Sequence, residues 1–145
     1  MHNKKILVSA CLLGENCKYN GGNNYSAAVA EFVKDQEVLP VCPEMMAGMG
    51  CPRTPIEIVG GVMTDRDGKN VDAAMRKAVE KAMALVRKED IQCAVLQSRS
   101  PTCGVNQIYD GSFSGKLISG SGTFAEALKA AGYKVIDAED IGQHL

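Results

Sequence analysis

Histidine is nearly absent from the sequence, and the only two, His2 and His144, lie at the ends of the 145-residue chain. Chain ends are the least ordered part of most domains, so neither histidine is expected in a catalytic site. This argues against Ser-His-Asp and Cys-His triads and against HExxH zinc sites and histidine-containing zinc deaminases. An enzyme with this sequence must therefore use Cys, carboxylates, Ser, Lys or Arg.

The sequence also lacks tryptophan, an excess of charge and any long apolar run. Its 16 Lys and Arg residues nearly balance 17 Asp and Glu residues, which argues against attachment to nucleic acid or a membrane surface through a bulk positive field. No apolar run approaches the roughly 18 residues of a membrane span, and the run at residues 6–8 is too short for a signal-peptide core. We therefore expect a cytoplasmic protein with no membrane partner.

The order of the predicted elements indicates an α/β fold. Apolar runs predict strands over residues 6–9, 38–41, 91–97 and 134–136, and helical spacing predicts helices over 26–35 and 71–86. A last helix is predicted to begin at a capping box of Thr123 and Glu126, and residues 56–63 are typical of irregular strand or hairpin. No repeat or linker divides the chain. We therefore predict a single Rossmann-like domain over residues 1–145, with a mainly parallel sheet and helices on both faces.

Cysteine is the residue type that carries the chemistry. Cys11, Cys42 and Cys103, here called the cysteine trio, each follow a predicted strand and lie in a turn beside Gly or Pro. Because parallel strands end at one edge of a sheet, where ligands bind, we expect the trio to converge there. Reduced thiols without histidine suit zinc or an iron–sulfur cluster, although buried packing is the ordinary role of a free cysteine.

The remaining three cysteines are less suited to a metal site, and no Cys-x-x-Cys pair occurs in the chain. Cys93 lies inside an apolar strand and is predicted to pack in the core. Cys17 and Cys51 lie in predicted loops, as surface or packing thiols, with a role as a fourth ligand left open. Four thiolates close a site for electron transfer or structure, whereas three leave one metal position open to substrate.

Two polar residues accompany the trio. Glu44 lies two residues after Cys42 and is a candidate general base, although the Pro-Glu pair also fits the first turn of a helix. Ser100 lies three residues before Cys103 and is a candidate donor to substrate, although Ser before Pro is also a common turn element.

A Gly-rich segment matches a nucleotide-binding pattern. Residues 120–125, Gly-Ser-Gly-Thr-Phe-Ala, fit the dinucleotide fingerprint G-x-G-x-x-A at a helix start. The strand predicted before it is short, and the remaining chain has no room for a second mononucleotide half. We therefore interpret the segment as a helix entry, with a nucleotide-binding module as a distant alternative.

Several segments match, in order, the motifs of a known family. They are residues 8–14, 17–21, 40–44 (Pro-Val-Cys-Pro-Glu), 52–57, 98–104 (Ser-Arg-Ser-Pro-Thr-Cys-Gly), 109–115 and 120–122. With these motifs, which span nearly the whole chain, the sequence resembles the thiouracil desulfidase (TudS-type) family. Lys18 and Asn20 replace the usual Arg and Asp, and residues 50–51 replace a Pro-containing pair, so the exact substrate is left open.

The resemblance implies an iron–sulfur-dependent enzyme with a [4Fe–4S] cluster, held by Cys11, Cys42 and Cys103, in which one iron is not ligated by protein. The family's catalytic residues fall on Glu44 and Ser100. The implied reaction is a non-redox hydrolysis of thiouracil to uracil and hydrosulfide, with Glu44 activating water and Ser100 donating a hydrogen bond.

The implied partner is a small-molecule thiolated base rather than a nucleic acid, although a nucleotide or a thiolated tRNA stays open as substrate. The substrate-binding residues and the oligomeric state are not predicted. The alternative function is a non-enzymatic iron–sulfur or zinc protein with a closed four-cysteine site.

Overall fold

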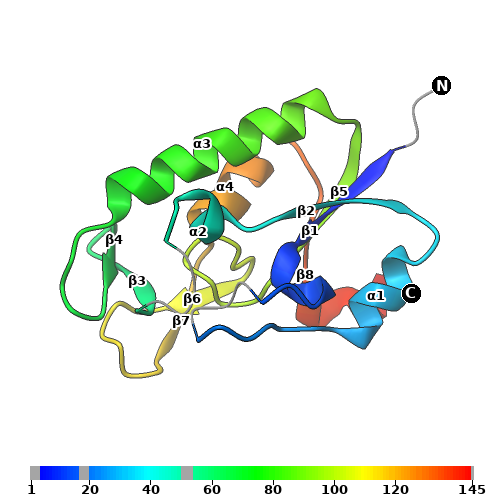
Figure 1. Cartoon of the computed structure of the whole chain (residues 1–145). Helices are drawn as coiled ribbons and strands as arrows, with labels where there is room; N and C mark the ends of the chain where they lie inside the picture. The colour runs from blue at the N-terminus through cyan, green and yellow to red at the C-terminus, as the bar shows by residue number, and fades with distance from the viewer. Residues whose placement is uncertain (1–3, 17–19, 50–53, 145) are drawn as a thin grey trace.

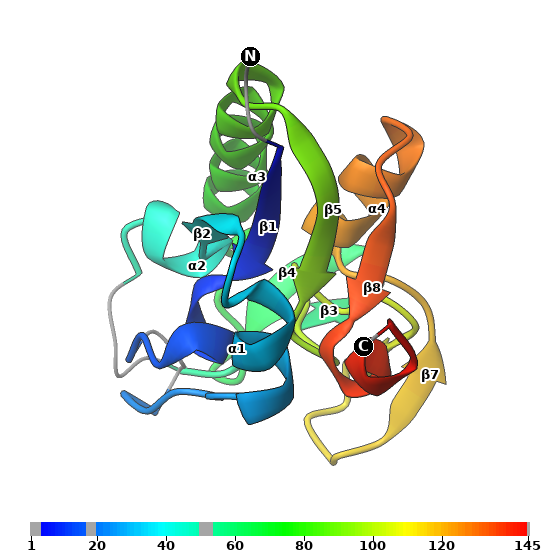
Figure 2. The same cartoon turned by 90° about the vertical axis from the view of Figure 1, so that its right-hand side faces the viewer.

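Four parallel strands form the central sheet of the structure, a computed structural model that describes residues 4–16, 20–49 and 54–144. The strands are β1 (Lys5–Ser9), β2 (Glu37–Val41), β5 (Ile91–Leu96) and β8 (Val135–Asp137), in the order β2-β1-β5-β8. Every pairing in this sheet is parallel, and Figure 2 shows the strands side by side, pointing the same way. The four predicted strands are confirmed.

Helices cover both faces of this sheet, as predicted. On one face lie α3 (Asp72–Lys88) and α4 (Thr123–Ala130), and on the other lie α1 (Ala27–Val33) and the 3-10 helix η2 (Ala138–His144) (Figure 1). Alternate residues of each strand point to opposite faces. Along β1, Leu7 packs in the α3–α4 core, whereas Ile6 and Val8 pack in the core with α1 and η2. The predicted α/β fold is therefore confirmed.

Helix α3 is close to its predicted limits. Its N-cap residue is Val71, whose side chain makes no cap hydrogen bond, and the Asn70 side-chain oxygen accepts from the Asp72 N–H at 2.9 Å in the turn just before the helix. The helix buries one stripe of apolar side chains along its length: Met75, Ala78, Val79, Ala82, Met83 and Val86. All six belong to the predicted apolar face.

The predicted capping box of α4 is wrong. The N-cap residue is Gly122, which offers no side chain, and the helix begins at Thr123. The first amides of the helix donate instead to backbone carbonyls of the loop that carries Cys103, so this loop replaces the cap.

Two antiparallel hairpins stand beyond the carboxyl ends of the central strands. One consists of β3 (Ile56–Val59) and β4 (Val62–Asp65), where irregular strand was predicted. The other consists of β6 (Gln107–Tyr109) and β7 (Leu117–Ser119). The short strand expected before residue 120 is β7, whereas β6 was not predicted. All three residues of β7 are exposed, so this strand has no buried face to produce an alternating pattern.

Chain segments that follow the central strands turn back at this same edge. The 3-10 helix η1 (Ala10–Leu13) follows β1, and α2 (Pro43–Met46) follows β2. Since β2 lies on one side of β1 and β5 on the other, the sheet changes winding direction between β1 and β5. Open α/β sheets bind ligands beyond such a switch point. Over the described ranges, no helix is both long and apolar enough to cross a membrane.

Candidate active site

The cysteine trio lies at the switch point of the sheet. Cys11 is in η1 after β1, Cys42 is the N-cap residue of α2 after β2, and Cys103 is in the loop after β5. All three line one cavity of about 490 Å³, together with Glu44 and Ser100. The structure thus brings all five predicted site residues together at one cavity.

Cys11 is held by a turn that closes behind it. Gly14 ends η1 with a φ of 94°, a left-handed conformation that glycine adopts without strain. The returning chain contacts Cys11 through Asn24, whose backbone N–H donates to the Cys11 carbonyl at 3.0 Å. The Asn24 side-chain amide donates to Cys11 Sγ at 3.6 Å. Asn24 therefore orients this sulfur, a role that has no local signal in the sequence.

The loop that carries Cys103 is ordered by Ser100. The Ser100 Oγ accepts hydrogen bonds from the backbone N–H groups of Thr102 and Cys103, each at 3.1 Å. This is the turn-forming role that a Ser before Pro suggests. The hydroxyl also lies 3.4 Å from Glu44 Oε1, so the same side chain orders the loop and faces the carboxylate.

The start of α4 braces this loop from behind. The amides of Gly122, Thr123 and Phe124 donate to the carbonyls of Gly104, Pro101 and Thr102, at 2.8, 2.9 and 2.9 Å.

A Cβ at position 122 would lie 2.4 Å from the carbonyl carbon of Thr102, so only glycine allows this approach. The amides that would bind a phosphate in a dinucleotide site are thus used for the cysteine loop. The structure therefore supports the helix-entry interpretation over the nucleotide-binding alternative.

Glu44 meets both descriptions that the sequence allowed. It lies in the first turn of α2, and its carboxylate also lines the cavity. Its Oε1 accepts a hydrogen bond from the Thr102 hydroxyl at 3.1 Å, and Thr102 is fully buried. Thr102 was missed by the sequence analysis, although its place beside Cys103 was the available signal.

Burial and a neighbouring charge both act on the thiol of Cys103. Burial, followed by the carboxylate of Glu44, raises the pKa of this thiol, and hydrogen bonds from Ser9 and Thr102 oppose the rise only in part. Ser9 also accepts from the Gln97 N–H at 2.9 Å, which fixes its hydroxyl. A thiolate in this position is favourable only beside a positive group such as a metal centre.

The spacing of the possible ligands bears on the kind of metal. A zinc ion with thiolate ligands at 2.3 Å needs sulfur atoms about 3.8 Å apart in a tetrahedral site. Among the residues that the structure describes, no three His, Cys, Asp or Glu side chains are grouped closely enough to hold one ion. A cluster of several irons has no such requirement, because each of its irons takes its own cysteine.

Residues of the two hairpins also line the cavity. Glu57 of β3 and Arg66, just after β4, line it together with Tyr109 and Phe113. Arg99 also lines the cavity, with its guanidinium paired to Glu139 of η2 at 2.7 Å. None of these five residues was predicted. All of them except Arg66 lie within the matched motif segments, and Glu57 had a further signal, because a Glu between two Ile residues of a strand points away from their apolar face.

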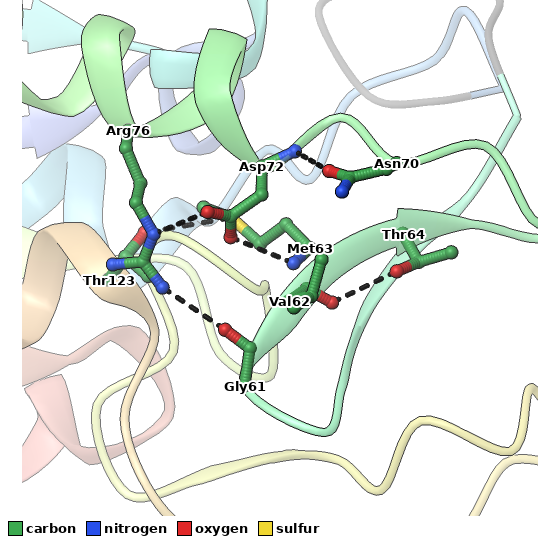
Figure 3. Close-up of polar contacts among 8 residues, drawn as sticks. All are labelled: Gly61, Val62, Met63, Thr64, Asn70, Asp72, Arg76 and Thr123. Atoms are coloured by element: carbon green, nitrogen blue, oxygen red, sulfur yellow. Dashed lines mark hydrogen bonds and ion pairs between the residues drawn. The ribbon is translucent and has the colours of Figure 1, made fainter.

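The β3–β4 hairpin is tied to α3 by a polar network (Figure 3). Asp72 accepts from the Met63 N–H at 3.0 Å and pairs with Arg76 at 2.7 Å, and Arg76 donates to the Gly61 carbonyl at 3.2 Å. The Met63 hydrogen bond, followed by that from Arg76, lowers the pKa of Asp72. The network fixes the hairpin, and with it the wall that carries Glu57.

The other cysteines lie apart or outside the described residues. Cys93 is 4% exposed and packs with Ile6, Val8 and Val95 in the core, as predicted. Cys17 and Cys51 lie outside the residues that the structure describes, so their predicted roles stay predictions.

Comparison with known proteins settles the family. A model described as 2-thiouracil desulfurase matches residues 6–140 of the chain. The chain belongs to the 2-thiouracil desulfurase family. The resemblance inferred from the motifs is thereby confirmed.

Two relatives of this desulfurase-family chain match it over nearly its whole length. One is an uncharacterized protein, YbbK, of Bacillus subtilis strain 168, 36% identical over 150 residues that cover 97% of this chain and 99% of the relative. The other is a solved structure of the [4Fe–4S]-dependent thiouracil desulfidase TudS, with a TM-score of 0.88 and 32% identity. That match covers 97% of this chain and 94% of the TudS chain.

Proposed function

We propose that this protein is a [4Fe–4S]-dependent desulfidase that converts thiouracil to uracil and hydrosulfide by non-redox hydrolysis. The observation that carries the proposal is the convergence of three thiols, from three different strand ends, on one cavity that also contains Glu44 and Ser100. The family membership and the similarity to TudS support it. The reduced thiols that the site needs are maintained in the cytoplasm, where we place the protein.

The donor set fits an iron–sulfur cluster. Cys11, Cys42 and Cys103 would hold it, and the hydrogen bond from the Asn24 side chain to Cys11 would support that sulfur ligand. When bound through three cysteines, such a cluster supplies a Lewis-acidic iron that is not ligated by protein and polarises the thiocarbonyl of the substrate.

Glu44 is suited to act as the general base. Its carboxylate lies at the cavity wall and is oriented by hydroxyl groups of Thr102 and Ser100 at 3.1 and 3.4 Å. It takes a proton from water as the water oxygen bonds to the ring carbon. Ser100 donates to the group on which charge develops.

The atoms and electrons of this reaction balance without a redox partner. The C=S bond of thiouracil is replaced by a C=O bond whose oxygen comes from water, and the sulfur leaves as hydrosulfide with one of the two water protons. The second proton is taken up by Glu44 and released to solvent. No carbon or sulfur atom accepts electrons from an external donor. The reaction therefore consumes one water for each uracil and hydrosulfide released.

The experiment is anaerobic turnover of 2-thiouracil in ¹⁸O-labelled water by cluster-loaded protein. We expect labelled uracil, an equal amount of hydrosulfide and no consumption of a reductant. A requirement for a reductant in every turnover would contradict hydrolysis. Purified protein with one zinc and no iron would contradict the cluster and favour the four-cysteine structural alternative.

The matched variants are Glu44→Gln and Glu31→Gln. Removing the base should lower turnover by about 10²–10⁴, the usual contribution of general acid–base catalysis, at unchanged iron content. The Glu31 side chain is exposed on α1, where it pairs with Lys34 at 3.1 Å, so its variant should turn over normally. Normal turnover by a fully loaded Glu44→Gln would remove Glu44 from the mechanism.

A further inference from the structure

We infer that Glu57 is a substrate-recognition residue, whose carboxylate accepts a hydrogen bond from the ring N–H beside the reacting thiocarbonyl. This inference rests on the proposed function and concerns the wall of the cavity provided by the β3–β4 hairpin. Glu44 and Ser100 have other roles in the proposed reaction, since Glu44 activates water and Ser100 donates to the group on which charge develops.

The position of Glu57 follows from strand alternation. Ile56 and Ile58 pack with Met63 and Met75 on the side of α3, so Glu57, between them, points to the other side of β3. There it is 8% exposed and lines the cavity. Burying a carboxylate this deeply costs free energy unless the group is hydrogen-bonded. The hydrogen-bond partners of Glu57 therefore indicate its function.

One oxygen of this carboxylate is used to hold a loop. Glu57 Oε1 accepts from the backbone N–H groups of Gly111 and Phe113, at 2.9 and 3.2 Å. A Cβ on Gly111 would lie 2.6 Å from the Ile58 carbonyl oxygen, so the loop sits directly on β3. Phe113, which lines the cavity, has a φ of 56°, a strained conformation that such contacts maintain.

The second oxygen, Oε2, accepts no hydrogen bond from the residues that the structure describes, and we assign it to the ligand. Both hydrogen bonds to the Glu57 side chain from described residues end on Oε1. The ion pairs among described residues do not include Glu57 either. The carboxylate therefore presents Oε2, in an orientation fixed by two backbone amides, to a donor that enters the cavity.

A thiolated pyrimidine carries such a donor next to its reacting carbon. In thiouracil a ring N–H adjoins the thiocarbonyl whether the sulfur is at position 2 or 4. When the bound ring covers this N–H from solvent, the N–H needs an acceptor, because a buried donor without one costs free energy. Hydrogen bonds to charged groups are stronger than neutral ones, so Glu57 would favour ring tautomers and substrates that present an N–H.

The test is a cycle of one protein change and one substrate change, made on the cluster-loaded enzyme. Glu57→Gln keeps the shape and lets the side-chain oxygen still accept from the loop amides, but replaces Oε2 by an amide donor. The substrates are 2-thiouracil and its 1-methyl and 3-methyl derivatives. Glu31→Gln serves as the control, because it removes a carboxylate at a distant exposed site.

We expect Glu57→Gln to lower kcat/KM for 2-thiouracil by about 10- to 150-fold, chiefly through KM, as for the loss of a hydrogen bond to a charged group. One of the two methyl derivatives should be poor for the wild type by a similar factor, and Glu57→Gln should then cost little further. Calorimetric binding of uracil should weaken by the same factor at unchanged iron content. Equal losses on all three substrates would overturn the inference.

The outcomes separate the inference from the proposed function. If the wild-type holoenzyme releases no hydrosulfide from any thiouracil, the proposed function fails. If it does, and Glu57→Gln acts equally on methylated and unmethylated substrates, only the role of Glu57 fails. Should Glu57→Gln not fold, binding of uracil and its two N-methyl derivatives to the wild type decides. Affinities that agree within about threefold would then contradict the inference.

Discussion

Gly122→Ala tests whether the contact between α4 and the cysteine loop holds the site together. Gly122 has a φ of −68°, which alanine adopts without strain, so the substitution adds only a methyl group. The new Cβ would lie 2.4 and 2.5 Å from the carbonyl carbon and oxygen of Thr102, and 2.8 Å from the Ser100 oxygen. All three of these atoms belong to the backbone, so the clash cannot be relieved by the rotation of a side chain.

The magnitude follows from the two ways in which the protein can respond. Ordinary contact begins at 3.4 Å, so relieving the clash moves the loop by about 1 Å. Such a shift would break the bonds from the amides of Gly122, Phe124 and Ala125, now 2.8–2.9 Å long, at about 1 kcal/mol each. If the loop stays in place, overpacking costs about 1–3 kcal/mol. We expect Gly122→Ala to lower the free energy of unfolding by about 3 kcal/mol, a value that both estimates include.

The assay is urea denaturation of the reduced, cluster-free protein, followed by reconstitution of the cluster without oxygen. The control is Gly142→Ala, because a Cβ there meets nothing within 4 Å. A loss of about 3 kcal/mol is a large part of a typical unfolding free energy of 5–15 kcal/mol, and the displaced loop should retain less iron. If Gly122→Ala unfolds at the same urea concentration as Gly142→Ala, the bracing role of α4 is refuted.

Three further predictions concern the thiols, Thr102 and the hairpin. Alanine at any one position of the cysteine trio should abolish the visible absorbance of the reconstituted cluster, whereas Cys93→Ala should keep it; iron analysis gives the check. Thr102→Val removes one hydrogen bond to the Glu44 carboxylate and should lower kcat by about tenfold or more with little change in KM, and Thr102→Ser should restore most of it. Asp72, whose folded-state pKa is lowered, should stabilise the protein fully above its ordinary pKa of 3.8 and lose this contribution as the pH falls through the lower folded value. Asp72→Asn should therefore flatten the pH dependence of urea unfolding below about pH 4, and an unchanged slope would contradict the sign worked out here.

The central layer was predictable because its strands are buried on both sides. Such strands are short, continuous apolar runs, and β1 and β5 have this composition. The parallel order then determined which loops meet, which is why Cys11, Cys42 and Cys103 were expected at one edge. The stripe of α3 was predictable for a similar reason, since its apolar residues recur at helical spacing.

The elements that were missed are those in which tertiary contacts outweigh local preference. Strand β6 has three residues, of which only Ile108 is buried, and the loop after it places Phe113 in a left-handed conformation that no local sequence pattern predicts. The Glu57 carboxylate holds that loop through hydrogen bonds to residues 54 and 56 positions later. Contacts of this separation leave no periodic trace in the sequence, so the wall of the cavity away from the cysteines was not predicted.

The Gly-rich segment before α4 shows that a sequence motif can predict local backbone geometry without identifying the ligand. A pyrophosphate and a protein backbone both need a glycine where they approach a helix start closely, and both take hydrogen bonds from its amides. The sequence pattern therefore reports close approach and free amides, and leaves the partner open. In this protein the carbonyls of Pro101, Thr102 and Gly104 occupy those amides. In a dinucleotide-binding fold this helix start binds phosphate, whereas in this protein it positions Cys103. The switch point of the sheet is therefore occupied by the cysteine trio.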